Sequence, residues 1–291
     1  MRIGVFGATG LIGSAVAAVL EARGDEVIRF SRVPRGEGWR LSEGELDLEG
    51  LEAIINMAGE SVGQRWTRSA MARIRDSRIG LTDRIVKALG ELPPEERPGI
   101  LLNGSAVGFY GDRGEEELSE DLGRGVGRLA ELCVDWEEAA MSASALGVRV
   151  ALLRTGIVLG PGAEAWERML RIFALGVGGR LGRGDQWMPW IHLADEVGGV
   201  IHALDRSEMK GPINLVSPGV VRNREWTAAL GGALRKPTVL PVPAIALRLV
   251  LGEFAHAVLA SSRAIPERLK ASGYRFRFPT LEGALTDLVD K

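Results

Sequence analysis

The first thirteen residues constrain the fold more than any other stretch of the chain. Arg2–Phe6 form a short apolar run, a glycine-rich turn follows at once, and Ser14–Arg23 carry apolar residues at helical spacing. A strand, a glycine turn and a helix N-terminus in this order bind the pyrophosphate of a dinucleotide, because the helix dipole and its free N–H groups attract an anion. We therefore predict a nucleotide site whose contacts are Gly7, Thr9, Gly10, Leu11, Ile12 and Gly13.

The end of the second expected strand, Glu26–Phe30, indicates which dinucleotide binds. NAD sites usually carry an acid here that bonds the ribose hydroxyls, whereas a 2′-phosphate needs a basic partner. This chain has Ser31 and Arg32 at that position, with Arg35 close behind. Because a guanidinium offers a planar fork of donors to phosphate, we predict NADP(H) as the cofactor and Ser31 and Arg32 among its contacts. The alternative is that both arginines are solvated loop charges.

Strands and helices alternate through the first half of the chain. Expected strands at Leu51–Asn56, Ile100–Ser105 and Val148–Leu153 alternate with expected helices at Trp66–Leu89 and Gly127–Leu146. This order predicts an α/β fold of the Rossmann type, with a doubly wound parallel sheet.

Open parallel sheets bind ligands at the carboxyl ends of their strands, and small residues there let a ligand approach the backbone. Two expected strands end in this way, and we expect further cofactor contacts from Ala58, Gly59, Glu60 and Ser105.

The alternation stops near residue 160. We expect residues 1–160 to form the Rossmann domain, with segments from 193–220 returning to it, and residues 161–291 to form a smaller substrate-facing lobe. Aromatic residues surround a proline in Trp187–His192, which we interpret as pocket-lining rather than as a buried strand. Tyr274–Pro279 alternate aromatic and basic residues, as an edge strand does.

Composition excludes several functional classes. The net charge is −2, which gives no electrostatic reason for nucleic acid or a membrane surface as partner. Cys133 is the single cysteine and the three histidines lack metal-ligand spacing, so we expect no metal. No later apolar run is long enough to span a bilayer, and glycines interrupt the apolar N-terminus, which a secretory signal would not tolerate. We expect a cytoplasmic protein with a small-molecule substrate.

Several of these motifs together resemble those of a known family. The glycine loop, Ala58-Gly59, Ser105–Gly111 and Arg154-Thr155-Gly156 are similar to those of extended short-chain dehydrogenases/reductases of the epimerase/dehydratase type. A narrower resemblance is to epimerase-family proteins with a small C-terminal extension, some of which are labelled cell-division inhibitors. It rests on Gln64–Thr67, Ser77-Arg78, Asp135-Trp136-Glu137, Pro189–His192, Pro241–Pro243 and the region from Ile265-Pro266 to Phe276.

The resemblance implies NADP(H) binding, and it also reveals a departure. Short-chain dehydrogenases/reductases carry Tyr-x-x-x-Lys on the helix before the Val148–Leu153 strand, where lysine lowers the tyrosine pKa and holds the ribose. The candidate helix here contains neither residue, and matching Glu137 to the family's glutamate puts Leu129 and Cys133 at those positions. The usual proton relay is therefore absent.

Other side chains could supply the chemistry. Our catalytic candidates are Ser105, at a strand end where the family polarises a substrate oxygen, Tyr110 and His192. The alternatives are a structural turn for Tyr110 and a satisfied structural histidine for His192. Glu137 is expected in an ion-pair network. For substrate contacts we select, on motif resemblance, Arg65, Gln186 and Trp190.

Two functions remain open at this point. One is an NADP-dependent oxidoreductase or epimerase-like enzyme that works without the tyrosine–lysine pair. The other is a non-catalytic NADP(H)-dependent regulator or scaffold, linked to cell division. An epimerase of sugar nucleotides is a third interpretation that only the family name supports.

Overall fold

A computed structural model describes residues 1–33 and 35–289. A seven-stranded sheet with all neighbouring pairs parallel runs through its centre, in the order β11-β7-β5-β4-β1-β2-β3. The strands span β1 (Arg2–Phe6), β2 (Glu26–Ser31), β3 (Trp39–Leu41), β4 (Ala53–Asn56), β5 (Ile100–Ala106), β7 (Arg149–Thr155) and β11 (Gly211–Leu215). The Rossmann-type parallel sheet expected from the alternating pattern is confirmed.

The strand order reverses at β1, and this reversal creates a crevice. From β1 the chain adds β2 and β3 on one side, then returns to add β4, β5, β7 and β11 on the other. Phe6 at the end of β1 is in register with Phe30 on β2 and with Asn56 on β4. Ligands of open parallel sheets bind outside the carboxyl ends at such a switch point, so the glycine turn after Phe6 lies where a ligand is expected.

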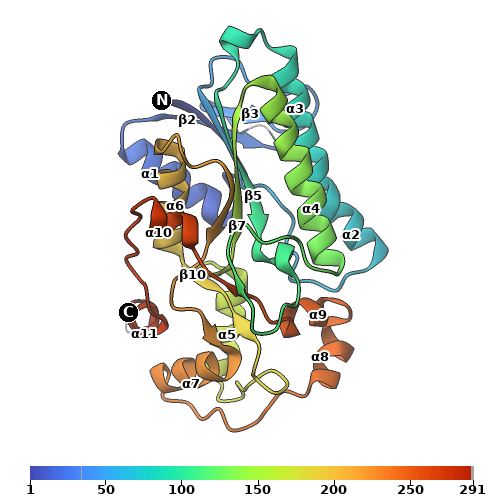
Figure 1. Ribbon diagram of the computed structural model, residues 1–291, viewed down its shortest axis with the longest axis vertical. Coiled ribbons are helices and arrows are strands. Elements are labelled where there is room, and N and C mark those ends of the chain that lie inside the picture. The colour runs from blue at the N-terminus through green and yellow to red at the C-terminus, as the bar shows by residue number, and fades with distance from the viewer. Residues whose placement is uncertain (34, 290–291) are drawn as a thin grey trace.

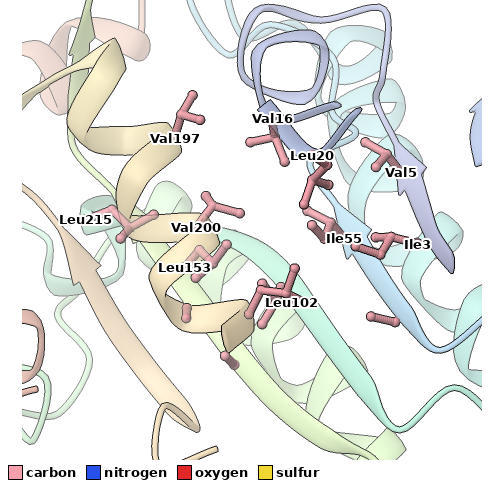
Figure 2. Packing of buried hydrophobic residues seen from close by; sticks show 14 of the residues in the cluster. Ile3, Val5, Val16, Leu20, Ile55, Leu102, Leu153, Val197, Val200 and Leu215 are labelled. Atoms are coloured by element: carbon pink, nitrogen blue, oxygen red, sulfur yellow. The ribbon is translucent and has the colours of Figure 1, made fainter. Parts of the chain in front are cut away.

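Helices cover both faces of the sheet (Figure 1). On one face α1 (Leu11–Ala22) and α6 (Leu193–Asp205) lie side by side, and on the other α3 (Leu81–Glu91) packs beside α4 (Arg128–Met141). Figure 2 shows the first layer, in which Val16 and Leu20 of α1 and Val200 of α6 meet inward-facing strand residues. Within the described residues, no helix combines the length and apolar character that crossing a membrane requires.

The expected single helix over Trp66–Leu89 is wrong in one respect. The structure has α2 (Arg68–Arg75), then a π-helical turn over Asp76–Gly80, and then α3. The apolar side chains Ile74 and Ile79 are five residues apart across this turn, because a π turn inserts an extra residue into the helical repeat.

Much of the chain after β7 builds a lobe below the sheet edge in Figure 1. Its helices include α5 (Glu164–Ala174), α7 (Asn223–Ala233), α8 (Ala244–Leu251), α9 (Phe254–Leu259) and α11 (Leu281–Val289), whereas α10 (Glu267–Ala271) packs on β11 of the sheet. The short parallel pair β8 (Ile157–Leu159) and β10 (Trp190–His192) joins the lobe to the sheet. Trp166, Trp190 and Trp226 form the centre of its core.

The pocket-lining interpretation of Trp187–His192 is wrong for its second half. Trp190 and Ile191 are fully buried in β10, and His192 is 6% exposed. A tryptophan can be buried when its indole N–H has an acceptor, and here it donates to the carbonyl oxygen of Gly219 at 2.8 Å.

The edge strand expected at Tyr274–Pro279 is also wrong, because these residues form no ladder with another strand. They form an extended strap that the carboxylate of Asp195 on α6 holds in place. Asp195 accepts hydrogen bonds from the backbone N–H groups of Arg277 and Phe278, both at 2.8 Å, and from the Tyr274 hydroxyl at 3.1 Å.

Candidate functional site

The glycine loop packs so closely that side chains are excluded from it. Gly7 has a φ of +75°, which glycine adopts without strain, and its carbonyl accepts a 2.9 Å hydrogen bond from the N–H of Gly10. A Cβ on Gly13 would lie 2.3 Å from the Gly7 oxygen, and one on Gly7 would lie 2.7 Å from the N of Ala58. The loop is therefore a backbone cradle pressed against the start of the segment that follows β4.

The N-terminus of α1 presents unpaired backbone donors to this cradle. Gly10 is its N-cap and offers no side-chain acceptor, and the first turn contains no acidic residue. The first N–H groups of a helix have no partner within the helix, so they are available to an anion. Thr9 and Gly10 are exposed at its mouth, and Leu11 and Ile12 are half-buried. These observations fit the pyrophosphate of a dinucleotide.

Basic residues surround the end of β2. The Ser31 hydroxyl is 8% exposed and accepts hydrogen bonds from the Val33 N–H at 3.3 Å and from Nε of Arg35 at 3.2 Å. Arg35 also lies over the Trp39 ring, 5.3 Å from its centroid, and Arg32 beside it is exposed. Sequence reasoning noted Arg35 without selecting it as a cofactor contact. In the structure its side chain is hydrogen-bonded to Ser31 and is therefore not a free loop charge.

Residues after β4 form the opposite wall of the crevice. The N–H of Ala58 donates to Asn56 Oδ1 at 3.3 Å, and Gly59 is exposed. The Glu60 carboxylate accepts hydrogen bonds from Gln64 and Arg73, and these hold its pKa below the usual range. Ala58 and Gly59 therefore offer backbone to a ligand, whereas the Glu60 side chain is already engaged with the protein.

A buried ion pair stands behind the end of β5. Arg154 on β7 and Glu137 on α4 are 4% and 7% exposed and form two hydrogen bonds of 2.8 Å. Ser105 Oγ lies 2.6 Å from Glu137 Oε1. Because a carboxylate paired with arginine only accepts, the serine hydroxyl is the donor. The expected ion-pair role of Glu137 is thus what the geometry shows.

Tyr110 extends this buried network, and its position corrects the expectation that it acts as an acid. The side chain is fully buried, and its hydroxyl lies 2.9 Å from Arg154 Nη1 and 2.8 Å from Asn214 Oδ1. Burial raises its pKa. A phenol with these partners holds the loop after β5 to β11 and has no surface to offer a substrate.

His192 and Trp190 are corrected for the same reason. His192 is the N-cap of α6: its Nδ1 accepts from the Ala194 N–H at 3.1 Å, and its ring lies on Phe278 with centroids 3.9 Å apart. Burial lowers its pKa, which favours the neutral ring that this cap needs. Trp190, expected at the substrate, is fully buried in the core of the lobe.

The other two substrate candidates do not line the same hollow. Gln186 lines a shallow hollow of the lobe, with Arg222 and Ser261 among its neighbours there. Arg65 is exposed and lies against Gly252, between α8 and α9. The structure therefore does not bring Arg65, Gln186 and Trp190 into one site.

Cys133, which the family resemblance would put at the lysine position, is buried on α4, and burial raises its pKa to about 12. This thiol is a core residue and not a nucleophile at neutral pH. Among the described residues, no group of three or more His, Cys, Asp or Glu side chains could hold a metal ion.

Sequence reasoning assigned no role to Arg78, which packs on the residues that follow β4. This arginine was noted only as part of a Ser-Arg pair. The break in helical spacing at Asp76–Gly80 was the available signal, because π turns occur frequently at functional sites.

Comparison with known proteins confirms the family resemblance. Residues 3–215 match the NAD dependent epimerase/dehydratase family and residues 242–288 match a domain of unknown function, DUF1731. The chain is 39% identical to epimerase family protein Mb2239 of Mycobacterium bovis, over 97% of this chain and 96% of that one. It is 37% identical to mouse epimerase family protein SDR39U1, over 99% and 100%.

A solved structure extends this likeness to three dimensions. Human epimerase family protein SDR39U1 (isoform2), crystallised with NADPH, superposes with a TM-score of 0.91 at 33% identity, and all of both chains is covered.

Proposed function

The chain belongs to the NAD dependent epimerase/dehydratase family, and on that premise we propose that it is an NADP(H)-dependent oxidoreductase that works without a tyrosine–lysine pair. The observation that carries the proposal is the order of groups along one sheet edge. Ser31 ends β2 and its two arginines follow, the backbone cradle follows β1, and Ser105 lies one residue before the end of β5. The human relative that was crystallised with NADPH supports this cofactor.

Bound NADP(H) would supply or accept a hydride. The glycine loop and the α1 N-terminus would hold its diphosphate, and Ser31, Arg32 and Arg35 would hold its 2′-phosphate.

Ser105 then sets the substrate's orientation. Its hydrogen is directed to Glu137, so its remaining lone pairs can only accept a hydrogen bond. The serine therefore suits a substrate that presents a hydroxyl, such as the alcohol form of a ketone–alcohol pair. We expect this small molecule to bind between the sheet edge and the lobe of residues 161–291.

Titration of the purified protein with NADPH and NADH, followed by nucleotide fluorescence, tests the cofactor. We expect clear preference for NADPH, and equal affinity for the two would refute the assignment.

A panel of quinones, aldehydes, ketones, alcohols and sugar nucleotides, with NADPH or NADP⁺ as appropriate, tests the reaction. We expect turnover of at least one compound and its loss in Ser105→Ala, with Ser105→Thr as the matched variant that keeps a hydroxyl. Tight NADPH binding without turnover across the panel would instead favour the non-catalytic regulator.

A further inference from the structure

Arg78 lies at the crevice between β1 and β4, held there by the π-helical turn. Its Nη1 donates to the carbonyl oxygen of Glu60 at 2.8 Å, and its guanidinium lies over the Trp136 ring, 5.2 Å from the centroid. A Cβ on Gly59 would lie only 2.7 Å from its Cζ. The cation is thus pressed against the backbone that follows β4.

This position is continuous with the glycine cradle. Gly7 packs on the Met57–Ala58 peptide, and Arg78 packs on the next two residues, Gly59 and Glu60. Because β1 and β4 are neighbours at the point where the strand order reverses, a ligand in the cradle passes this wall.

The Arg78 guanidinium interacts electrostatically with the Glu60 carboxylate but forms no salt bridge with it. Among the described residues no carboxylate forms a salt bridge with Arg78, and the nearby Glu60 carboxylate pairs with Arg73 instead. Only Nη1 of Arg78 donates hydrogen bonds to described groups, both of them carbonyl oxygens. Burial lowers its pKa. A half-buried guanidinium with unused donors is costly unless acceptors arrive from elsewhere.

We propose that Arg78 is a cofactor-binding residue whose unused Nε and Nη2 donors take oxygen acceptors of the dinucleotide's ribose–diphosphate backbone. This inference rests on the proposed function, since it requires a dinucleotide in the cradle. It assigns Arg78 a role separate from that of Arg32 and Arg35. Those two arginines stand at the end of β2, on the other side of β1, and would read the 2′-phosphate. Arg78 would bind a part that NADPH and NADH share.

The experiment compares NADPH with NADH, because Arg78 would bind a part that both cofactors share, whereas the 2′-phosphate is present only in NADPH. Arg78→Met and Arg78→Gln should each weaken NADPH and NADH binding by the same factor, at least about 10-fold, because hydrogen bonds to charged groups are stronger than those between neutral groups. Arg75→Gln is the matched control: Arg75 precedes the same turn, but it pairs with Asp135 at the surface. It should leave both affinities within about twofold, as expected for a surface ion pair.

The outcomes distinguish a failure of the proposed function from a failure of the role assigned to Arg78. Wild-type protein that fails to bind NADPH would overturn the proposed function and this inference with it. Wild-type binding that is unchanged in Arg78→Met and Arg78→Gln would overturn this inference alone, as would a loss confined to NADPH.

If Arg78→Met does not fold, as judged by circular dichroism, Arg78→Lys and Arg78→Gln decide the question. Lysine keeps the charge but lacks the fork of donors, so we expect affinities in the order arginine, lysine, glutamine. Three equal affinities would contradict the role.

Discussion

The two ends of the site edge differ in how their polar groups are satisfied. Near β1 and β2 the donors are backbone N–H groups and arginine side chains that use few protein acceptors. Near β5 and β7 the charged groups pair with each other: Glu137 bonds Arg154 and Ser105, and Arg154 bonds Tyr110. Donors in the first region have few acceptors among the described residues, whereas the polar groups of the second region are hydrogen-bonded to one another.

This difference suits the region near β1 and β2 to binding the cofactor and the region near β5 and β7 to positioning Ser105. A region with unsatisfied donors is prepared for an anion, and its sequence can vary little because backbone fills the space. A satisfied buried network instead fixes the positions of its members, among them Ser105, which is 6% exposed and lies one residue before the end of β5. The four predictions below test this contrast, starting with the largest effect.

Removing one partner of the buried Arg154–Glu137 pair should have the largest effect, a loss of folding stability. Arg154→Met leaves the Glu137 carboxylate buried without its partner, which should lower the free energy of unfolding by about 3–5 kcal/mol in urea denaturation. Asp135→Asn is the control, because Asp135 on the same helix pairs with Arg75 at the surface and should change stability by less than about 1 kcal/mol. The double variant Arg154→Met with Glu137→Leu should recover most of the loss. Equal losses of stability in Arg154→Met and Asp135→Asn would show that the buried pair matters no more to folding than the surface pair.

A side chain in the cradle should damage binding next. Gly13→Ala places a Cβ against the Gly7 oxygen, and such overpacking costs roughly 1–3 kcal/mol. If the loop must recover its native geometry to bind, this is about 5- to 150-fold in NADPH affinity. Gly232→Ala on α7 is the control, because a Cβ there would meet no described atom within 4 Å. Calorimetric titration that finds Gly13→Ala binding as tightly as Gly232→Ala would show that the loop does not hold the ligand.

Reversing the charge beside Ser31 should alter selectivity. Arg32→Asp should weaken NADPH binding about 10-fold, since it removes a charge-assisted bond to phosphate, and should leave NADH binding unchanged. The same fluorescence titration measures both cofactors, and NADH serves as the internal control. A parallel loss of both affinities would place Arg32 at a different part of the cofactor.

The satisfied region also contains one exception, whose effect on stability is modest for each pH unit. Glu196 on α6 is fully buried, accepts a 2.7 Å hydrogen bond from Thr155 at the end of β7, and has a pKa that burial raises from 4.5 to about 8. The folded state therefore keeps a proton that the unfolded chain releases, and stability falls as pH rises between these two values.

Glu196→Gln removes this titration. Relative to wild type, its stability should improve by on the order of 1 kcal/mol for each pH unit through this window, as measured by thermal unfolding at several pH values. The exposed Glu138→Gln on α4 should show no such trend. A constant difference between wild type and Glu196→Gln would contradict the buried, protonated state.

Local patterns predicted much of the sheet and its binding loop. Arg2–Phe6 is the first strand to the residue, and the glycine spacing identified the cradle, because an apolar run and three glycines at fixed spacing are visible within one short stretch of sequence. The side chains around the end of β5 were harder. Tyr110 and His192 are chemically suitable acids, and only their contacts with Asn214 and Phe278, distant in sequence, show that they are structural.

Arg78 was missed for a related reason. Its pattern is that of a surface arginine on a helix, and its burial follows from the π turn and from Trp136 on another helix. Trp190 shows the opposite error: a cluster of aromatic residues was interpreted as a pocket, but its indole acceptor lies 29 residues further along the chain.

The strap of residues 274–278 has a consequence for how the chain is made. Synthesis produces α6 and β11 long before the residues that complete them, because Asp195 needs the backbone of Arg277 and Phe278, and Asn214 donates to the carbonyl oxygen of Ile265. Until those residues leave the ribosome, Asp195 lacks these backbone partners and Asn214 lacks one of its own, although Asn214 still bonds Tyr110 and Leu118. The folding of the two matched family regions is therefore coupled, and a chain that stops before the strap should be more susceptible to proteases.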